Sequence, residues 1–422
     1  MRTLGELSTA TNLDSPSICT VTLLYPTRQR CIDEPAKLLS IKRDSVAVSQ
    51  IDLETIAASF DIHGRFVGGR QYGSGHINDT FAVRFDDGGN RVRYVLQRVN
   101  QEVFKNVPAL MENVDRATLH VSASLERRNI PDRSRRVMSL TSTTEGSTYH
   151  VDPAGGYWRA FPFIEGTTSY DVLATHDQAY QVARAFGGLQ TMLADLPDPP
   201  LHETIPKFHD GPARFRAFVD ALERDPLNRA ADAESEIAFL VENASSFDRF
   251  PALVKSGALP LRVTHNDCKS NNVLIDDVTG EGICVIDLDT LMPGLVLYDF
   301  GDMVRTSTCP VAEDSQALED VQMDLERFKY LTHGYLASAG EFLTAAEREQ
   351  MVFAGKVITL TIGARFLTDY LQGDTYFKTQ RPTHNLDRCR VQFALVGSIV
   401  EQESAMHAVV EQAAAGRELA PR

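Results

Sequence analysis

The sequence predicts an α+β fold of two lobes, a small antiparallel β-sheet lobe with one helix followed by a larger, mainly helical lobe. Two observations predict this class. Short runs of alternating apolar and polar residues, separated by turn signals, fill residues 66–99, whereas apolar residues recur at helical spacing over most of the chain beyond residue 170. The length of 422 residues suits two lobes with a cleft between them better than one compact unit.

In the first lobe, three strands are expected between Phe66 and Val99. FVGGRQY leads into GSGHIND, TFAVRF alternates apolar and polar residues, DDGGN turns the chain and RVRYVLQRV returns. A helix is expected over about 108–128, where Pro108 suits the first turn. Its apolar residues form one stripe, made of Leu110, Met111, Val114, Ala117, Val121 and Leu125. Two further extended segments, RVMSL and GYWRAFPFI, complete the sheet.

The second lobe begins with a helix whose start is signalled by Thr175 and Gln178, the spacing of a capping box. The helix that follows buries one face, made of Tyr180, Ala183, Phe186, Leu189 and Leu193. Further helical patterns cover residues 212–225, 233–245, 316–338, 344–371 and 391–413. This part of the chain is therefore expected to be mainly helical.

Composition excludes several classes of function. A net charge of −15 argues against nucleic-acid binding, which requires a basic surface. No run of eighteen apolar residues occurs and the N-terminus lacks the order of a signal peptide, so neither a membrane span nor secretion is expected. The cysteines have no spacing typical of zinc sites or disulfide frameworks: Cys19, Cys31, Cys268, Cys284, Cys309 and Cys389. Reduced thiols in a cytoplasmic protein are the expectation.

One short stretch, VTHNDCKSNNVLID at 263–276, concentrates polar residues directly before an apolar run. VLID and the later ICVID at 283–287 are predicted to form a hairpin around the turn DVTGEG. A hairpin centred between Thr279 and Gly280 places Asn272 opposite Asp287. Amide and carboxylate oxygens then meet at one end of the hairpin, which suits Mg²⁺.

The spacing His265-x-Asp267-x-x-x-x-Asn272 matches the catalytic loop of protein kinases, with Asn266 in place of the arginine. In that loop the aspartate accepts the proton of the attacking hydroxyl, and the asparagine and a later aspartate hold metal. We assign that later aspartate to Asp287. A literal D-F-G occurs at 299–301, but it lies beyond the hairpin, so Asp299 is expected to bond backbone groups instead.

A purely structural interpretation remains open for each of these residues, because Asp and Asn commonly form turns and cap strands. Four matched positions, together with a hairpin that joins two of them, favour a site over this alternative.

These residues resemble those of the aminoglycoside phosphotransferase and choline kinase group. HND-K--NN, followed by VIDLDT-MPG and YDFGD, is closer still to the N-acetylhexosamine 1-kinases. The resemblance runs from about Ser49 to near the C-terminus. It implies a bilobal protein-kinase-like fold, ATP and Mg²⁺ as cofactors, and transfer of the γ-phosphoryl group to the anomeric hydroxyl of GlcNAc or GalNAc.

The resemblance also implies domain boundaries. Residues 1–48, rich in Ser, Thr and Pro, are expected to be a poorly structured extension. Residues 49–165 would form the nucleotide-binding lobe, and residues 166–422 the helical lobe with the catalytic loop and the substrate pocket.

Roles carry over position by position. The resemblance implies that Asp267 is the base, that Lys269 neutralises the transferring phosphate and that Asn272 and Asp287 hold the metal. The Gly-rich loop falls on Gly73, Ser74 and Gly75, whose backbone N–H groups approach phosphate. The backbone of Phe163 and Ile164, in the connection between the lobes, is expected to contact adenine.

One position departs from the protein-kinase pattern. The third strand has Gln97 where protein kinases have the lysine that pairs with the α- and β-phosphates. Arg98 points to the opposite face of the strand and is not an easy replacement. Glu112 is the candidate partner acid in the helix that follows.

The acceptor is expected to contact polar and aromatic side chains. Besides Asp267, the sequence offers Asp289, which alternates to the same side as Asp287, and Arg365 with Tyr376 near a helix end. A neutral N-acetylhexosamine tolerates an arginine in its pocket better than cationic choline or an aminoglycoside does.

Two alternatives stay open. The first is a kinase of another small hydroxyl compound, namely choline, homoserine, methylthioribose or an aminoglycoside. The second is a nucleotide-binding pseudokinase, motivated by Gln97 but opposed by the intact Asp267, Asn272 and Asp287. A P-loop NTPase is not expected, because no G-x-x-x-x-G-K-[ST] occurs.

Overall fold

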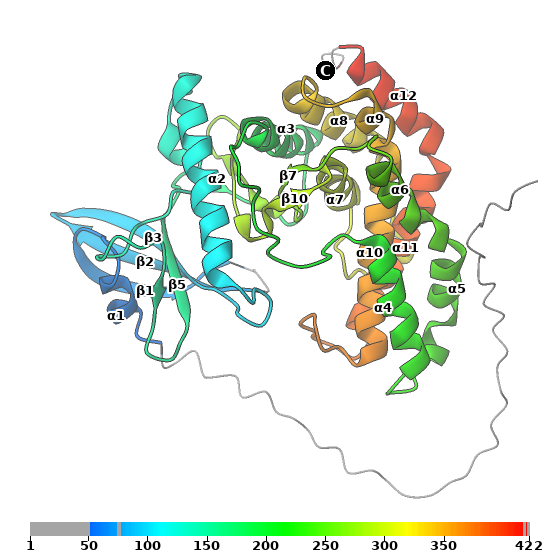
Figure 1. Cartoon of the computed structure of the whole chain (residues 1–422), viewed down its shortest axis with the longest axis horizontal. Coiled ribbons are helices and arrows are strands. Elements are labelled where there is room, and N and C mark those ends of the chain that lie inside the picture. The colour runs from blue at the N-terminus through cyan, green and yellow to red at the C-terminus, as the bar shows by residue number, and fades with distance from the viewer. Residues whose placement is uncertain (1–50, 74–76, 417–418, 420–422) are drawn as a thin grey trace, which may run out of the picture. The chain divides into compact units, whose positions relative to one another are not determined.

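The computed structural model describes residues 51–73, 77–416 and 419, and the chain divides into a first unit, Met1–Ile51, and a second, compact unit, Asp52–Arg422. The expected extension over residues 1–48 lies outside the described residues. The second unit contains a β-sheet followed by a series of helices (Figure 1), which confirms the α+β class. Its first element is the short helix α1 (Leu53–Ala58), which Asp52 caps by accepting a hydrogen bond from the Thr55 N–H.

The first sheet has five antiparallel strands in the order β1-β2-β3-β5-β4. The three strands expected between Phe66 and Val99 are confirmed, and GYWRAFPFI supplies a fourth. The strand bounds are β1 (Arg65–Gln71), β2 (Asp79–Asp87), β3 (Asn90–Arg98), β4 (His150–Val151) and β5 (Tyr157–Pro162). The turn between β2 and β3 requires glycine, because Gly88 and Gly89 have φ values of 60° and 95°.

The expected strand at RVMSL is wrong. Residues 136–140 form no strand in the described structure. The next residue, Thr141, makes an isolated bridge to Ala160, and β4 occupies the sheet edge. Its start is tied to the second lobe, because Arg135 pairs with Asp276 at 2.7 Å and Arg136 pairs with Glu281 at 3.1 Å. These ion pairs hold the segment against the hairpin at residues 273–285 rather than in the sheet.

Helix α2 (Val107–Arg127) forms as expected, with Asn106 as its N-cap and Pro108 in the first turn. All six residues of the predicted stripe are at most 5% exposed. Burying a leucine such as Leu110 in this way contributes roughly 1.5–3 kcal/mol. The stripe belongs to a hydrophobic core that continues into the helical lobe.

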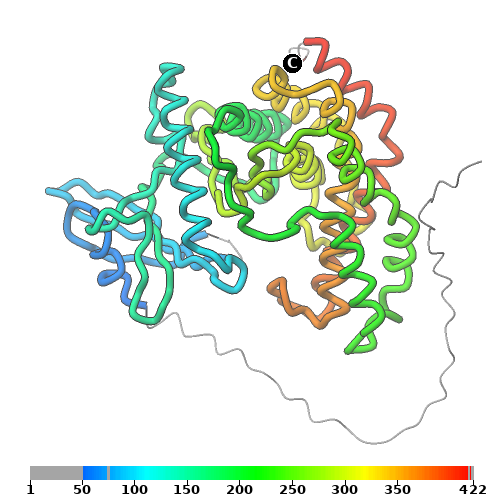
Figure 2. The backbone as a smooth tube through the Cα atoms, in the orientation of Figure 1, coloured from blue at the N-terminus to red at the C-terminus, as the bar shows by residue number. Residues whose placement is uncertain are grey.

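The second lobe is mainly helical, as Figure 2 shows for the green-to-red part of the tube. Thr175 and Gln178 form the predicted capping box of its first helix. The helices are α3 (His176–Leu193), α4 (Gly211–Arg224), α5 (Glu234–Glu242), α6 (Arg249–Lys255), α7 (Val296–Thr308), α8 (Leu325–Ala339), α9 (Ala345–Glu349), α10 (Met351–Gln372), α11 (His384–Glu401) and α12 (Glu403–Ala414).

Three helix predictions differ in their bounds. The pattern at 316–338 yields a helix only from Leu325, because Asp324 caps its first turn. The pattern at 344–371 divides into α9 and α10 at Gln350, and the last pattern divides into α11 and α12 at Gln402. Helices α6 and α7 were not expected.

Helix α10 is long and apolar enough to be compared with a membrane-spanning helix. Among the described residues it is the one helix whose length and mean hydropathy of 1.4 would suffice to cross a membrane. In this protein 78% of that window is buried inside the fold, as in a core helix. The expectation that no segment is apolar enough for a span is therefore too strong for α10.

Two smaller sheets carry the residues around the polar cluster. One consists of β6 (Thr167–Thr168), β8 (Val273–Asp276) and β9 (Gly282–Val285). The other pairs β7 (Arg262–Thr264) with β10 (Met292–Gly294). The polar cluster therefore lies in the loop between two strands of different sheets, where its backbone is fixed at both ends.

Candidate active site

Hydrogen bonds to Asp299 of α7 fix the backbone at the start of the loop from His265 to Asn272. The Asp299 carboxylate is fully buried and accepts hydrogen bonds from the His265 N–H at 2.8 Å and the Asn266 N–H at 2.6 Å. The Gln190 side chain donates a third bond at 2.7 Å. Asp299 thus has the structural role expected for it, because it fixes the backbone that leads into Asp267.

Asn266, which stands where protein kinases have arginine, has a local structural function. Its φ is 66°, in the left-handed region that asparagine tolerates better than most residues. Its side chain is 4% exposed and donates a hydrogen bond to the Thr290 carbonyl at 2.9 Å. The residue turns the loop and joins it to the segment that follows β9.

Asp267 and Lys269 form an ion pair, with 2.9 Å between the Lys269 Nζ and an Asp267 Oδ. Burial opposes ionisation of Asp267, but the charge and hydrogen bond of Lys269 outweigh it and lower the pKa of the carboxyl. Burial likewise disfavours the Lys269 cation, yet Asp267 and Glu313 raise its pKa to about 12. Both groups are charged at neutral pH.

The predicted register of the β8–β9 hairpin is wrong by one residue. Val273 pairs with Val285 and Leu274 with Cys284, and the register shifts between Leu274 and Ile275. Asn272 is therefore opposite Ile286, whose N–H donates to the Asn272 carbonyl at 2.9 Å. Asp287 is the next residue along.

Despite this shift, Asn272 and Asp287 line the same cavity. The Asn272 amide N–H donates to the Asp267 carbonyl at 2.9 Å, and its Oδ1 has no recorded donor among the described residues. Asp287 has a φ of 60°. Burial raises the pKa of Asp287 to about 6, and the charges of Asp289 and Asp267 add to this rise.

This donor set fits Mg²⁺. A buried carboxylate and an amide oxygen are hard ligands, and the neighbouring negative charges favour a cation. The described residues contain no group of three or more His, Cys, Asp or Glu side chains placed to hold a metal. The protein would therefore supply two ligands, and the remaining ones would be water and phosphate oxygens, as is usual for Mg²⁺ at a phosphoryl-transfer site.

The cavity has a volume of about 420 Å³ and joins three parts of the structure. Its first end carries side chains from the first sheet, its middle carries the catalytic loop, and its far end lies against α11. The lining includes Asn78, Thr80 and Gln97 at the first end and Asp267, Lys269, Asn272 and Asp287 in the middle. At the far end it includes Arg305, Glu313, His384, Arg388 and Gln392.

Gln97 is held in place by side-chain hydrogen bonds. Its Nε2 donates to Thr80 Oγ1 at 3.0 Å, and its Oε1 accepts two bonds from Arg159, at 2.9 and 3.1 Å. Arg159 was missed by sequence reasoning. Arg98 is not among the described residues that line the cavity, in agreement with its expected orientation.

Glu112 is not the partner acid of this strand position. Its carboxylate is half exposed and contacts His202 at 2.9 Å. It lies on the exposed side of α2, whereas the buried stripe faces the core.

The prediction that Asp289 binds the substrate is corrected by the structure. Asp289 is 2% exposed, forms an ion pair with Arg159 at 2.5 Å and accepts a hydrogen bond from the Asn78 side chain at 2.7 Å. Both oxygens are therefore engaged. It lies behind the cavity wall rather than in the described lining.

Phe163 and Ile164 lie in the connection between β5 and β6. The Phe163 N–H donates to the Arg93 carbonyl at 3.0 Å, and its ring contacts the Arg93 guanidinium at 3.6 Å and the Tyr72 ring at 5.4 Å. Neither Phe163 nor Ile164 belongs to the described lining of the cavity. Their contact with adenine stays a prediction.

The predicted Gly-rich loop is only partly described. Gly73 has a φ of 82°, which favours glycine, and a Cβ at this position would meet nothing within 4 Å. Ser74 and Gly75 lie outside the described residues. A role of this loop in binding phosphate stays a prediction.

Arg365 and Tyr376 are brought together, but not in the cavity that holds Asp267. The Arg365 guanidinium lies 5.6 Å from the Tyr376 ring and 5.0 Å from the Phe208 ring. Nearby, burial and, to a smaller extent, the Arg365 charge lower the pKa of Arg214 to about 10. The binding of acceptor by Arg365 and Tyr376 stays a prediction.

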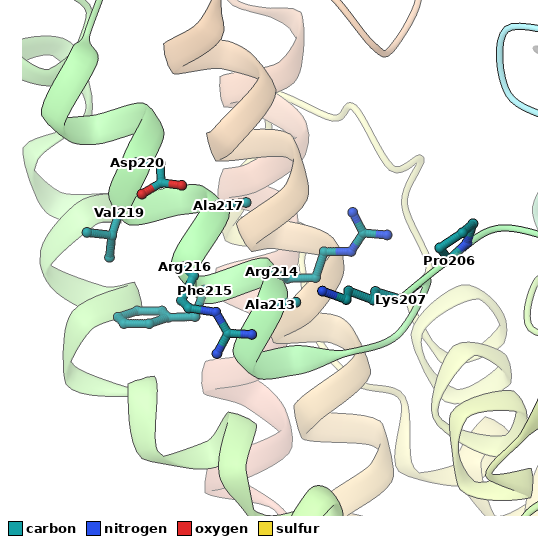
Figure 3. Close-up of a pocket in the computed structure, with 9 residues that line it drawn as sticks. All are labelled: Pro206, Lys207, Ala213, Arg214, Phe215, Arg216, Ala217, Val219 and Asp220. Atoms are coloured by element: carbon teal, nitrogen blue, oxygen red, sulfur yellow. The ribbon is translucent and has the colours of Figure 1, made fainter.

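A second cavity, of about 570 Å³, lies along the first turns of α4 (Figure 3). Its charged lining residues are Lys207, Arg214, Arg216 and Asp220. Its lining includes none of Asp267, Lys269, Asn272 and Asp287. The chemistry of a kinase-like loop therefore points to the cavity of about 420 Å³.

Comparison with known proteins agrees with this geometry. A crystal structure of aminoglycoside phosphotransferase from Alicyclobacillus acidocaldarius subsp. acidocaldarius DSM 446 matches with a TM-score of 0.56 and 13% identity, over 88% of this chain and 99% of that chain. Choline kinase from Cryptosporidium parvum Iowa II matches with a TM-score of 0.48 and 15% identity, over 84% and 93%. Spectinomycin phosphotransferase, solved with ADP and spectinomycin, matches with a TM-score of 0.46 and 13% identity, over 82% and 94%.

The match to the Alicyclobacillus aminoglycoside phosphotransferase and the family model show a protein-kinase-like fold. Residues 68–333, which include most of the first sheet, the loop from His265 to Asn272 and α7, match the model of the phosphotransferase enzyme family. The chain belongs to this family, named APH.

Proposed function

We propose that this phosphotransferase uses ATP and Mg²⁺ to phosphorylate the anomeric hydroxyl of an N-acetylhexosamine, GlcNAc or GalNAc, and releases the sugar 1-phosphate. The observation that carries the proposal is that Asp267, Lys269, Asn272 and Asp287 line one cavity. The sugar itself is supported by the sequence resemblance of HND-K--NN and VIDLDT-MPG to N-acetylhexosamine 1-kinases.

In this proposal Asp267 accepts the proton of the anomeric hydroxyl as the oxygen attacks phosphorus. The Asp267 carboxyl is ionised at neutral pH because Lys269 lowers its pKa, so it is ready to accept a proton. An anomeric hydroxyl is somewhat more acidic than an ordinary alcohol, which makes a carboxylate base sufficient. Asp299 fixes the backbone that positions Asp267.

Phosphoryl transfer depends mainly on positioning and on stabilisation of charge. Lys269 remains a cation at working pH, since its pKa is raised to about 12 by Asp267 and Glu313 against the opposing effect of burial. It would neutralise charge on the transferring group. Asn272 and Asp287 would hold Mg²⁺, which supplies further charge neutralisation when bound.

The far end of the cavity is proposed to bind the acceptor, because the nucleotide lobe occupies the other end. Its apolar wall is formed by Val311, Val391 and Leu395 of the described lining. Gln392 is 2% exposed, and its Oε1 has no hydrogen-bond partner among the described residues. A buried carboxamide without a partner is costly, and an acetamido or hydroxyl group of a sugar would satisfy it.

A panel of acceptors tests this proposal. Purified protein with Mg·ATP would be incubated separately with GlcNAc, GalNAc, glucose, choline, homoserine, methylthioribose and an aminoglycoside, and products identified by ³¹P NMR. We expect a sugar 1-phosphate from at least one N-acetylhexosamine. Turnover of choline or an aminoglycoside without any hexosamine product would contradict the proposed acceptor, and nucleotide binding without turnover of any acceptor would favour the pseudokinase.

A further inference from the structure

We propose that Arg159 is a positioning residue for phosphoryl transfer. It supplies, from the neighbouring strand β5, the buried cation that Gln97 does not carry, and it joins the nucleotide lobe to the segment that aims Asp287. This inference rests on the proposed kinase function but not on the identity of the acceptor.

Arg159 is 1% exposed, and each of its guanidinium nitrogens has a partner. Nη1 lies 2.5 Å from Asp289 Oδ1, and it also approaches the Met111 sulfur at 4.0 Å. Nε and Nη2 both donate to Gln97 Oε1, at 3.1 and 2.9 Å. The planar guanidinium therefore bridges two acceptors in fixed directions, which a lysine ammonium does not do.

On one side the network reaches the cavity through the sheet. Gln97 and Arg159 are directly paired across β3 and β5, so their side chains lie on the same face. Gln97 in turn donates to Thr80 on β2, and both Gln97 and Thr80 line the cavity. Arg159 thus orients the strand residues that face the nucleotide without lining the cavity itself.

This arrangement gives a physical reason for the glutamine. A lysine at position 97 would place a second cation beside the buried guanidinium, and like charges at that distance repel. Glutamine offers an oxygen to Arg159 and an N–H to Thr80 at the same time. The buried cation therefore lies on β5 rather than on β3, and Gln97 on β3 accepts hydrogen bonds from it.

On the other side the network reaches the metal-binding segment. Asp289 follows Asp287 by two residues, within the short 3₁₀ turn Leu288–Thr290. Its second oxygen accepts from the Asn78 side chain at 2.7 Å, and Asn78 Oδ1 accepts from the Asn100 N–H at 3.0 Å. Arg159 and Asn78, both from the first lobe, together fix the turn that Asp287 directly precedes.

A buried ion pair is weak evidence of stability, since an apolar pair of similar volume often serves equally well. The position of this pair, between the residues that face the nucleotide and the residue that would hold Mg²⁺, favours a role in orientation. Partners that orient ligand-bearing segments typically change metal affinity or activity by roughly 10–100-fold when removed.

The test is calorimetric titration of the full chain with the non-hydrolysable nucleotide AMP-PNP, once with Mg²⁺ and once with EDTA. Arg159→Met is expected to weaken binding of Mg·AMP-PNP by about tenfold or more and to change metal-free binding by less than about twofold. Arg159→Lys is expected to recover part of the loss. Arg98→Met, on the same pair of strands but outside the network, is the matched control and should bind like the wild type.

Two further variants keep the test decisive if Arg159→Met does not fold. The double variant Arg159→Leu/Asp289→Leu removes both charges and keeps an apolar contact, and it should fold yet show the same selective loss with Mg²⁺. The double variant Gln97→Lys/Arg159→Gln places the cation on β3 instead of β5. It should bind Mg·AMP-PNP better than Arg159→Met does.

Wild-type binding of Mg·AMP-PNP by a folded Arg159→Leu/Asp289→Leu protein would overturn the proposal, because the pair would then be structural only. Equal losses with and without Mg²⁺ would overturn it as well. The calorimetric readout requires no acceptor, so failure of the wild type to phosphorylate an N-acetylhexosamine would refute the proposed sugar and leave this result standing.

Discussion

Replacing Asp287 with asparagine should stabilise the metal-free protein while it weakens Mg²⁺ binding. Asparagine is nearly the same size as aspartate and tolerates the φ of 60° at this position. The substitution therefore removes the charge and leaves the backbone in place. Its effect on stability reports the cost of that charge directly.

The magnitude follows from the pKa of Asp287. Burial, helped by the charges of Asp289 and Asp267, raises this pKa from 3.8 to about 6. Because the folded state holds the proton more tightly than the unfolded state, this stabilisation is complete below pH 4 and is lost as the pH rises through 6. At neutral pH the ionised carboxylate therefore costs on the order of 2–3 kcal/mol.

The assay is thermal unfolding in EDTA. With an unfolding entropy of about 2.1 cal/mol/K per residue, the cost of the charge corresponds to a rise in Tm of about 3 °C for Asp287→Asn at pH 7.5. The difference between variant and wild type should shrink at pH 4.5, where the wild-type carboxyl is protonated. Added Mg·ATP should raise the Tm of the wild type more than that of the variant. A variant that is less stable than wild type at pH 7.5 in EDTA would refute the reasoning.

Three further predictions concern neighbouring residues. Asp299→Asn should lower the free energy of unfolding, measured in urea, by roughly 3 kcal/mol. One of the charge-assisted bonds to the His265 and Asn266 N–H groups would be lost, and an amide N–H would face a donor. An unchanged urea midpoint would contradict this prediction. Lys269→Met should lower kcat about a hundredfold with little change in the KM for acceptor, whereas a change confined to KM would contradict a role in the transition state. Gln392→Leu should raise the KM for acceptor about tenfold and leave the KM for ATP unchanged; an effect on ATP instead would place the acceptor elsewhere.

The parts of the site that the sequence predicted are those set by local spacing. Asp267, Lys269 and Asn272 lie within six residues of each other, so one loop brings them to the same cavity. Asp287 was found because a hairpin returns it to the same end. The structural role of Asp299 followed from its distance from that hairpin.

The register of the hairpin was missed for a local reason. The Asp276 carboxylate accepts hydrogen bonds from the Val278 and Thr279 N–H groups, and beside this turn Ile275 pairs with Gly282, two residues off the predicted register. The irregularity between Leu274 and Ile275 then reduces the offset to one residue. Alternation of apolar residues does not reveal such an irregularity, because VLID and ICVID are apolar on both faces. A one-residue error resulted.

Arg159 was missed, and Asp289 was wrongly expected to contact the acceptor, because their partners are distant in sequence. Each alone is a single charged residue in an apolar strand or turn, and alternation assigns such residues to an exposed or ligand-facing side. Residues 158–161 of β5 are instead all buried, and Arg159 contacts Met111 of α2 and Asp289 rather than solvent. The sequence separation of 130 residues between Arg159 and Asp289 leaves no pattern that pairs them.

The proposed role of Asp267 as the base that activates an anomeric hydroxyl is tested by ³¹P NMR of the product formed with Mg·ATP and N-acetylhexosamine. The wild type is expected to give a sugar 1-phosphate. Asp267→Asn should lower kcat by about 10²–10⁴-fold while calorimetry shows nearly unchanged binding of Mg·AMP-PNP. Retained turnover in Asp267→Asn, or phosphate found on another hydroxyl, would contradict the account.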